Sequence, residues 1–206
     1  MSLYDQLVKR YGPNTPIFFS EIKYQDYSTQ WIQLELRTLC SRKKLKRFER
    51  GIYYIPTSTP FGDSLLDPRK VIEKKYIRTS EATFGYYSGA AFLNQLGLST
   101  QMPNVIEICT NHEASKRRTV TVGKQTVYLR KARTTITDEN VYILSFMEMM
   151  NSIDRNFLTP ERRRLVQKYM RQKNITGKDI AQYAPDFPDR TMRTLVESEV
   201  IFDAAR

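Results

Sequence analysis

Polar side chains lie at short spacing between residues 28 and 37, where they could exchange hydrogen bonds with a nucleic acid. They carry hydroxyl, amide and guanidinium groups, and they are Ser28, Thr29, Gln30, Gln33 and Arg37. Amide and guanidinium groups form hydrogen bonds to base edges, whereas hydroxyls and cations also contact phosphates. The chemistry that these residue types favour is therefore the binding and reading of DNA.

A dense run of cations follows at residues 42–50. One carboxylate, that of Glu49, stands among six basic residues, which are Arg42, Lys43, Lys44, Lys46, Arg47 and Arg50. The formal net charge of the chain is +11, and residues 1–57 contribute +5 of it from ten basic and five acidic side chains. Such an excess favours a polyanionic partner, because bound cations release the counterions of the phosphates.

The elements that must position these groups can be predicted from spacing. Ile32, Leu36 and Leu39 recur at the interval that places apolar side chains on one face of a helix. Gly51 then allows a tight turn before the β-prone run 52–55. A polar-faced helix, a basic turn and two short strands predict a winged helix-turn-helix. The alternative is an ordinary amphipathic helix followed by a solvated basic loop.

The remainder of the N-terminal region is expected to complete this domain. We predict a first helix over 2–11, capped by Ser2 and stopped by Gly12-Pro13, and a short helix capped by Ser20 that runs through Ile22 and Tyr24. Residues 26–28 are expected to form a turn. Trp31 and Leu34 do not fit the apolar face of the main helix. We expect them to pack on the first helix or on the second domain, and the other interpretation places Trp31 near the DNA backbone.

The rest of the chain predicts an α+β protein of three parts. Residues 57–68 are rich in proline and small polar residues and suggest a linker. We predict a winged helix-turn-helix domain over 1–57, a mixed α/β domain with a small sheet over 58–158, and a C-terminal helical bundle over 159–206. The middle part includes a strand at 105–110, a hairpin turning at Gly123-Lys124, and a buried helix over 141–153.

The residue types and their spacing give little support for a catalytic site. Cys40, Cys109 and the lone His112 are too few to form a metal site, and His112 has no evident partner for a nucleophilic triad. Asp67 with residues 73–75 (Glu-Lys-Lys) matches the pattern of a metal-dependent nuclease, but we expect that string to be a helix surface. We therefore expect no enzyme activity and no cofactor. Without a signal peptide or a long apolar run, we expect a cytoplasmic protein that does not bind membranes.

Two segments carry a resemblance to a known family. The wing sequence RGIYYIP at 50–56 and the segment YYSGAAFLNQLGLSTQMPNVIEICT at 86–110 resemble the AbiEi-type antitoxins of bacterial abortive-infection, or type IV toxin–antitoxin, systems. They are similar more narrowly to the shorter proteins labelled DUF6088, over about residues 1–155. This resemblance implies a winged helix that binds operator inverted repeats in double-stranded DNA and represses its own operon. It also implies a second domain that counteracts a co-encoded nucleotidyltransferase toxin.

Carried over to this sequence, the resemblance places DNA contacts on the polar helix residues from Ser28 to Arg37 and on Arg47 and Arg50 beside the wing. It gives no antitoxin surface, for which the basic loop 116–118 and Gln101 are our conjecture. The leading hypothesis is a DNA-binding antitoxin. The second is a winged-helix transcriptional regulator without a toxin partner, and the third is a protein-interaction module whose charge serves solubility. We expect a monomer or weak dimer that pairs on DNA.

Overall fold

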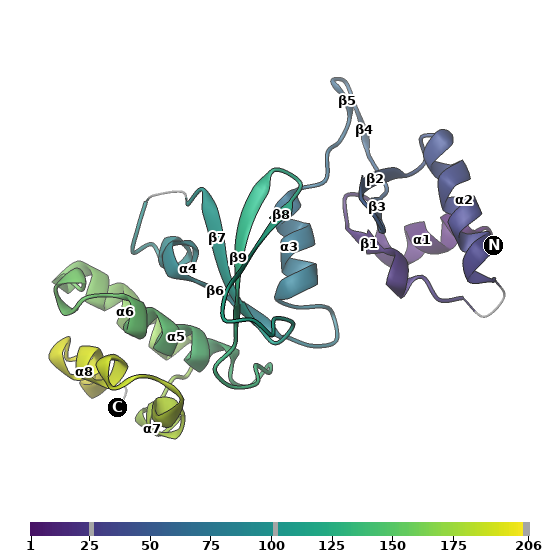
Figure 1. Ribbon diagram of the computed structural model, residues 1–206. Coiled ribbons are helices and arrows are strands. Elements are labelled where there is room, and N and C mark those ends of the chain that lie inside the picture. The colour runs from purple at the N-terminus through teal and green to yellow at the C-terminus, as the bar shows by residue number, and fades with distance from the viewer. Residues whose placement is uncertain (25–26, 101–102, 204–206) are drawn as a thin grey trace. The chain divides into compact units, whose positions relative to one another are not determined.

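The computed structural model describes residues 1–24, 27–100 and 103–203 and has a mixed α+β architecture (Figure 1). The chain divides into two compact units, which we call unit 1 (Met1–Lys74) and unit 2 (Lys75–Arg206). The predicted boundaries at 57/58 and 158/159 do not mark the limits of these units, and the three-domain division stays a prediction. Within the described ranges, no helix is both long enough and apolar enough to cross a membrane.

Unit 1 combines two helices with a small antiparallel sheet. Its elements are α1 (Leu3–Tyr11), β1 (Ile17–Phe18), a 3-10 turn (Phe19–Glu21), α2 (Thr29–Ser41), β2 (Lys46–Glu49) and β3 (Ile52–Tyr54). The sheet order is β1-β3-β2, so the first strand pairs with the third across the intervening helix. Gly51 takes φ of 76° between β2 and β3, which confirms that a glycine is needed at this tight turn.

Local capping explains where the helices of unit 1 begin. The hydroxyl of Ser2 accepts a hydrogen bond from the backbone N–H of Asp5, whose side chain in turn accepts from Ser2. Gly12, at φ of 66°, ends α1 as predicted. The hydroxyl of Ser28 accepts from the N–H of Trp31 and so fixes the start of α2.

The core of unit 1 lies between α1, α2 and the sheet. The predicted apolar face of α2 is confirmed, because Ile32, Leu36 and Leu39 are all buried. They join one cluster with residues of α1, of β1 and of the segments next to β2 and β3, including Leu3, Leu7, Ile17, Leu45 and Ile55. Burial of this face holds α2 in place and leaves its opposite face free.

The predicted short helix capped by Ser20 is wrong. The chain forms a single 3-10 turn, which follows β1 directly and has no side-chain cap. The reason is tertiary, since the N–H of Phe19 is bonded to the carbonyl of Gly51 at 2.8 Å. That bond ties residue 19 to the β2–β3 turn, and Ile22 leaves the helical conformation at ψ of 87°, so the turn ends there. Asp26, predicted to lie in the following turn, falls outside the described residues.

The segment predicted to be a linker forms a hairpin, β4 (Ser58–Thr59) and β5 (Gly62–Asp63). The base of the hairpin is bonded to the rest of unit 1. The side chain of Asn14 donates to the hydroxyl of Thr57 at 3.0 Å, and the hydroxyl of Tyr54 donates to the carbonyl of Ser64 at 3.2 Å. Phe61 at the tip is fully exposed. These bonds hold the hairpin as a projection of unit 1 (Figure 1).

Unit 2 is built on a four-stranded sheet of order β6-β7-β9-β8. After α3 (Pro68–Tyr76), which crosses from unit 1, come β6 (Gly85–Ser88), α4 (Gly89–Gln95), β7 (Val105–Thr110), β8 (Arg118–Val122), β9 (Gln125–Lys131) and α5 (Val141–Ser152). The predicted strand at 105–110 and the hairpin at Gly123-Lys124 are confirmed. The parallel pairing of β7 with β9 and the strand β6 were not predicted from the sequence.

The C-terminal helices are α6 (Pro160–Gln172), α7 (Gly177–Tyr183) and α8 (Asp189–Glu197), with 3-10 turns at 155–157, 184–186 and 200–203. Their apolar side chains share one core with α5 and the sheet. Val166 and Leu195 belong to the same buried cluster as Tyr86 and Phe146. Met147, Met149 and Met150 fill the centre of that cluster, as predicted for the buried helix.

Candidate nucleic-acid interface

Helix α2 exposes several polar side chains on the side facing away from its buried residues, which we call its polar face. The side chains of this polar face are all exposed, and they are Thr29, Gln30, Gln33 and Arg37. Ser28 is exposed as well, but its hydroxyl oxygen is engaged as the helix cap, accepting from Trp31 at 3.2 Å. The start of α2 therefore places backbone N–H groups and polar side chains together, an arrangement suited to an anionic partner.

The basic segment, residues 42–50, follows α2 without a gap. Arg42 caps the C-terminus of the helix, and Lys43 turns the chain with φ of 59°, a left-handed conformation. Leu45 is then buried beneath the segment. The N–H groups of both Lys44 and Leu45 bond to the carbonyl of Leu39. One apolar anchor and two backbone bonds thus hold the cations in a defined turn on the surface.

The cations of this segment have different surroundings. Arg42, Lys43, Lys44, Arg47 and Arg50 are exposed, whereas Lys46 is half-buried. The ammonium of Lys44 lies 4.9 Å from the centre of the Tyr4 ring, and the Nε of Arg47 donates to the carbonyl of Glu49 at 3.3 Å. Lys46 forms an ion pair with Asp63 of the hairpin at 3.2 Å. All eleven residues predicted to contact DNA lie between Ser28 and Arg50 of unit 1.

Trp31 and Leu34 are not part of the buried core of unit 1, where packing on the first helix would place them, and their packing on the second domain stays a prediction. Leu34 is 61% exposed and Trp31 is 39% exposed. The indole of Trp31 stacks on the ring of Tyr27, with centroids 4.1 Å apart and planes 14° apart. The exposed face of α2 therefore carries apolar groups among its polar ones. The sequence already contained a sign of this exposure, because neither residue falls on the predicted apolar face of α2.

Cys40 lies near the end of α2 and is half-buried. Burial raises the pKa of its thiol, and the positive charge of Arg47 opposes that rise. A thiol with a raised pKa is protonated at neutral pH and is a poor nucleophile. Cys40 is therefore best described as part of the packing of α2.

The sequence matches the model of a family of unknown function, DUF6088, over residues 7–177. The chain belongs to the DUF6088 family. No curated protein matches it. The DUF6088 match begins within α1 and ends at the first residue of α7, so it includes the polar face of α2, the basic segment and the whole sheet of unit 2.

The nuclease pattern within the DUF6088 match lies on α3 and its cap. Asp67 accepts a hydrogen bond from the N–H of Arg69 at 2.8 Å, at the start of the helix. Lys74 pairs with Glu21 at 2.6 Å and also donates to the carbonyl of Pro16. Across the part of the chain that the structure describes, no three His, Cys, Asp or Glu side chains group as ligands for a metal ion. The residues of this pattern thus have structural contacts.

The basic loop considered as an antitoxin surface is ordered by a buried carboxylate. Glu113 accepts hydrogen bonds from the N–H and the hydroxyl of Ser115 and from the Nε of Arg118 at 2.7 Å. The guanidinium of Arg117 lies 4.1 Å from the centre of the Tyr128 ring, and Lys116 is exposed. Gln101, the other residue considered, lies outside the described residues.

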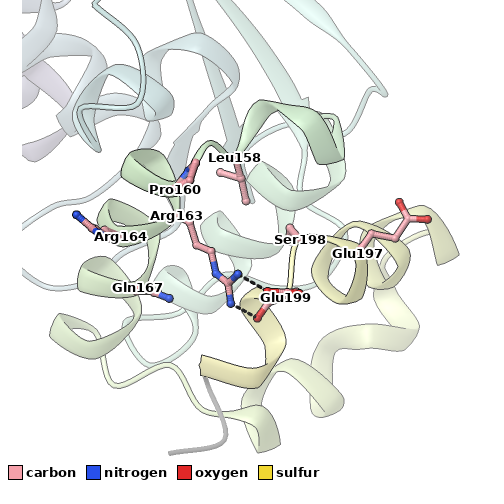
Figure 2. A pocket seen from close by; sticks show the side chains of 8 residues that line it. All are labelled: Leu158, Pro160, Arg163, Arg164, Gln167, Glu197, Ser198 and Glu199. Atoms are coloured by element: carbon pink, nitrogen blue, oxygen red, sulfur yellow. Dashed lines mark hydrogen bonds and ion pairs between the residues drawn. The ribbon is translucent and has the colours of Figure 1, made fainter.

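A hollow of about 440 Å³ lies where α6 meets the end of α8 (Figure 2). Arg163 points across it and donates to the carboxylate of Glu199 at 2.5 Å and to the Glu199 carbonyl at 3.1 Å. Arg164 extends away from this pair (Figure 2). At the start of α6, the guanidinium of Arg162 lies over the Phe157 ring at 4.2 Å. Because the Arg163 charge is matched by a carboxylate, the hollow is a weaker anion site than the basic segment.

Proposed function

We propose that this DUF6088 protein is a DNA-binding protein and that unit 1 is a winged helix-turn-helix domain. The order of elements supports the proposal, since α1, β1, α2, β2 and β3 follow the sequence of a winged helix, with the 3-10 turn in the place of its second helix. The sheet order β1-β3-β2 also suits that fold, because the wing strands β2 and β3 pair beside the first strand. In this proposal, α2 is the recognition helix.

One observation carries the proposal. The polar face of α2 continues directly into the basic segment, which Leu45 and the carbonyl of Leu39 hold on the surface. A helix of the width of α2 fits the major groove, and cations next to it can neutralise the flanking phosphates. Gln30, Gln33 and Arg37 would then face base edges, while residues 42–50 would contact the backbone. Proteins that recognise DNA usually combine base contacts, which read the sequence, with phosphate contacts, which position the protein.

We further propose that the protein represses its own operon and counteracts a co-encoded nucleotidyltransferase toxin. This role rests on the resemblance to AbiEi-type antitoxins carried by residues 50–56 and 86–110. Unit 2, which contains the second of these segments, would supply the antitoxin function. We assign no catalytic step to either unit, since Asp67 and Lys74 of the nuclease pattern have the structural contacts described above.

The salt dependence of DNA binding tests the first proposal. Duplexes that tile the region upstream of the gene are titrated with the full chain at several salt concentrations. Neutralising Lys43 and Lys44 together by alanine should flatten the log–log slope by about 1.8, which is about 0.9 for each lost phosphate contact. The matched control replaces Lys168 and Arg171, two exposed cations of α6 in unit 2, and should leave the slope unchanged. An equal slope for wild type and the Lys43/Lys44 variant would refute the assignment.

Co-expression tests the antitoxin role separately. Cells that express the product of the neighbouring gene should recover growth when this protein is supplied. The same rescue should persist with the Lys43/Lys44 variant if unit 2 acts independently of DNA binding. Absence of rescue by a wild-type protein that binds DNA would reject the antitoxin role and leave a plain transcriptional regulator.

A further inference from the structure

The exposed face of α2 has an apolar residue at its centre, Leu34. Successive residues of an α-helix are about 100° apart, so Leu34 lies about 200° around the helix from the buried Ile32. The structure agrees, since Leu34 is 61% exposed and Ile32 is buried. Gln30 and Arg37 stand four residues before it and three residues after it, the spacing of neighbours on a helix surface. A partner that contacts the middle of the polar face would therefore contact Leu34.

Trp31 extends the apolar surface along the same face, and it is held in place. Its indole stacks on Tyr27, and Tyr27 meets the ring of Tyr24 edge-on at 6.5 Å. Its backbone N–H is bonded to the hydroxyl of Ser28. A side chain fixed in this way loses little conformational entropy when a partner binds. Trp31 therefore limits the space beside Leu34 without adjusting to the partner.

The surroundings of Leu34 favour one kind of partner. The exposed side of α2 carries amides and a guanidinium, and the adjoining basic segment carries six cations. This charge complements a polyanion and disfavours a second copy of the same face. The major groove of DNA is anionic and polar, but each thymine places one apolar group in it, the C5-methyl. An aliphatic side chain among base-reading polar groups suits that methyl group.

We propose that Leu34 reads thymine by contact with its C5-methyl group, and that Trp31 bounds the space in which this methyl lies. The inference rests on the proposed function, because it requires α2 to enter the major groove. It makes Leu34 a specificity-determining residue. The preferred half-site contains a thymine that faces Leu34, next to base pairs that Gln30 and Arg37 read.

Replacement of thymine by uracil tests the proposal directly, because the two bases differ in the C5-methyl alone. The full chain selects duplexes from a randomised 20-bp pool, and the tightest duplex is resynthesised with deoxyuridine at one thymine at a time. One or two positions should lose affinity by about four-fold, the factor that corresponds to removal of one buried carbon. The same positions should show no difference between thymine and uracil for Leu34→Ala.

Two further variants sharpen the result. Leu34→Gln keeps a long side chain on the helix but removes the aliphatic end, and it should also bind thymine and uracil duplexes equally. Leu65→Ala removes a leucine of unit 1 that is 84% exposed and lies outside α2, and it should keep the four-fold difference. The slope of affinity against salt should be the same for all three variants, since none changes a charge.

The outcomes separate the inference from the proposed function. If no duplex binds with salt-dependent affinity, the DNA-binding proposal fails, and the inference fails with it. If duplexes bind but every deoxyuridine substitution is neutral, DNA binding stands and methyl reading is overturned. Discrimination that persists in both Leu34 variants would also overturn it, since another residue would then contact the methyl. A changed sedimentation mass of Leu34→Ala without any effect on discrimination would assign Leu34 to self-association instead.

Discussion

The Nζ of Lys46 lies 3.2 Å from Oδ2 of Asp63, which joins strand β2 of the basic segment to the hairpin. Both side chains are about one-third exposed, so the pair contributes at most about 1 kcal/mol to stability. The larger effect of this ion pair is to neutralise the charge of Lys46. Lys46 is one of the six cations proposed to contact DNA, and its charge is already matched within unit 1.

Release of Lys46 should strengthen DNA binding. In Asp63→Asn, the ammonium loses its carboxylate and becomes available to a phosphate. We expect tighter binding and a log–log salt slope that is steeper by up to about 0.9. Titration at several salt concentrations measures both quantities, and Asp67→Asn provides a carboxylate control that is not paired with the basic segment. A slope for Asp63→Asn equal to that of wild type would place Lys46 away from the DNA.

The cap of α2 can be separated from its proposed DNA contact at Ser28. Ser28→Ala removes the acceptor for the N–H of Trp31 and should lower the free energy of unfolding by about 1 kcal/mol. Ser28→Asp should keep the cap but place a negative charge against phosphate, so stability should be retained while affinity falls. Urea unfolding followed by the fluorescence of the single tryptophan, together with a binding titration, measures the two effects. Equal affinity of the aspartate variant and wild type would remove Ser28 from the interface.

Gly85 should be intolerant of any side chain. A Cβ at this position would lie 2.0 Å from the backbone carbonyl oxygen of Tyr76, so the backbone itself would have to shift to make room. We expect Gly85→Ala to reduce the free energy of unfolding of unit 2 by about 3 kcal/mol or more. Gly177→Ala is the matched control, because its Cβ meets no atom within 4 Å. Similar melting temperatures for the two variants would contradict the close contact.

The buried carboxylate of Glu148 should be among the most sensitive groups of unit 2. It lies 3.0 Å from Arg130 and 3.1 Å from Arg133, and its side chain is almost fully buried. Glu148→Ala leaves both guanidinium groups without their carboxylate and should lower the free energy of unfolding by about 3–5 kcal/mol. Glu139→Ala, at an exposed glutamate, should change it by less than about 0.5 kcal/mol. Urea unfolding followed by circular dichroism distinguishes these outcomes.

Glu113 should make the stability of unit 2 depend on acid pH. The hydroxyl and N–H of Ser115, followed by the guanidinium of Arg118, lower the pKa of Glu113 to about 2. Because the folded pKa lies below the unfolded value of about 4.3, the carboxylate stabilises the fold above that pH. This contribution is lost as the pH falls from about 4.3 towards 2. The difference in melting temperature between wild type and Glu113→Gln should therefore shrink between pH 5 and pH 2.5. A constant difference would show that the carboxylate charge is not the cause.

Local patterns predicted the elements that depend on neighbouring residues. Ser2 and Gly12 delimit α1, and the spacing of Ile32, Leu36 and Leu39 gives the buried face of α2. The hairpin at Gly123-Lys124 was likewise predicted from a two-residue turn between β-prone runs. In each case, the cap, the turn or the periodicity acts over a few residues, so the sequence contains the information.

Contacts between distant residues could not be predicted in the same way. The bond from Phe19 to the carbonyl of Gly51 replaces the predicted short helix, and the bond from Asn14 to Thr57 holds the predicted linker as a hairpin. Strand β6 pairs with β7 across α4, and Gly85 lets the start of β6 lie close to the backbone of Tyr76 in α3. Such pairings depend on chain closure over long separations, which no local pattern records.

The same division applies to the candidate interface. The density of cations at residues 42–50, their place after α2 and the residue types of the polar face could all be predicted from local patterns. The pairing of Lys46 with Asp63 and the exposure of Leu34 at the centre of the polar face appear only in the folded protein. The physical reason is that charge and polarity belong to each residue, whereas burial and pairing depend on which distant segment lies opposite it.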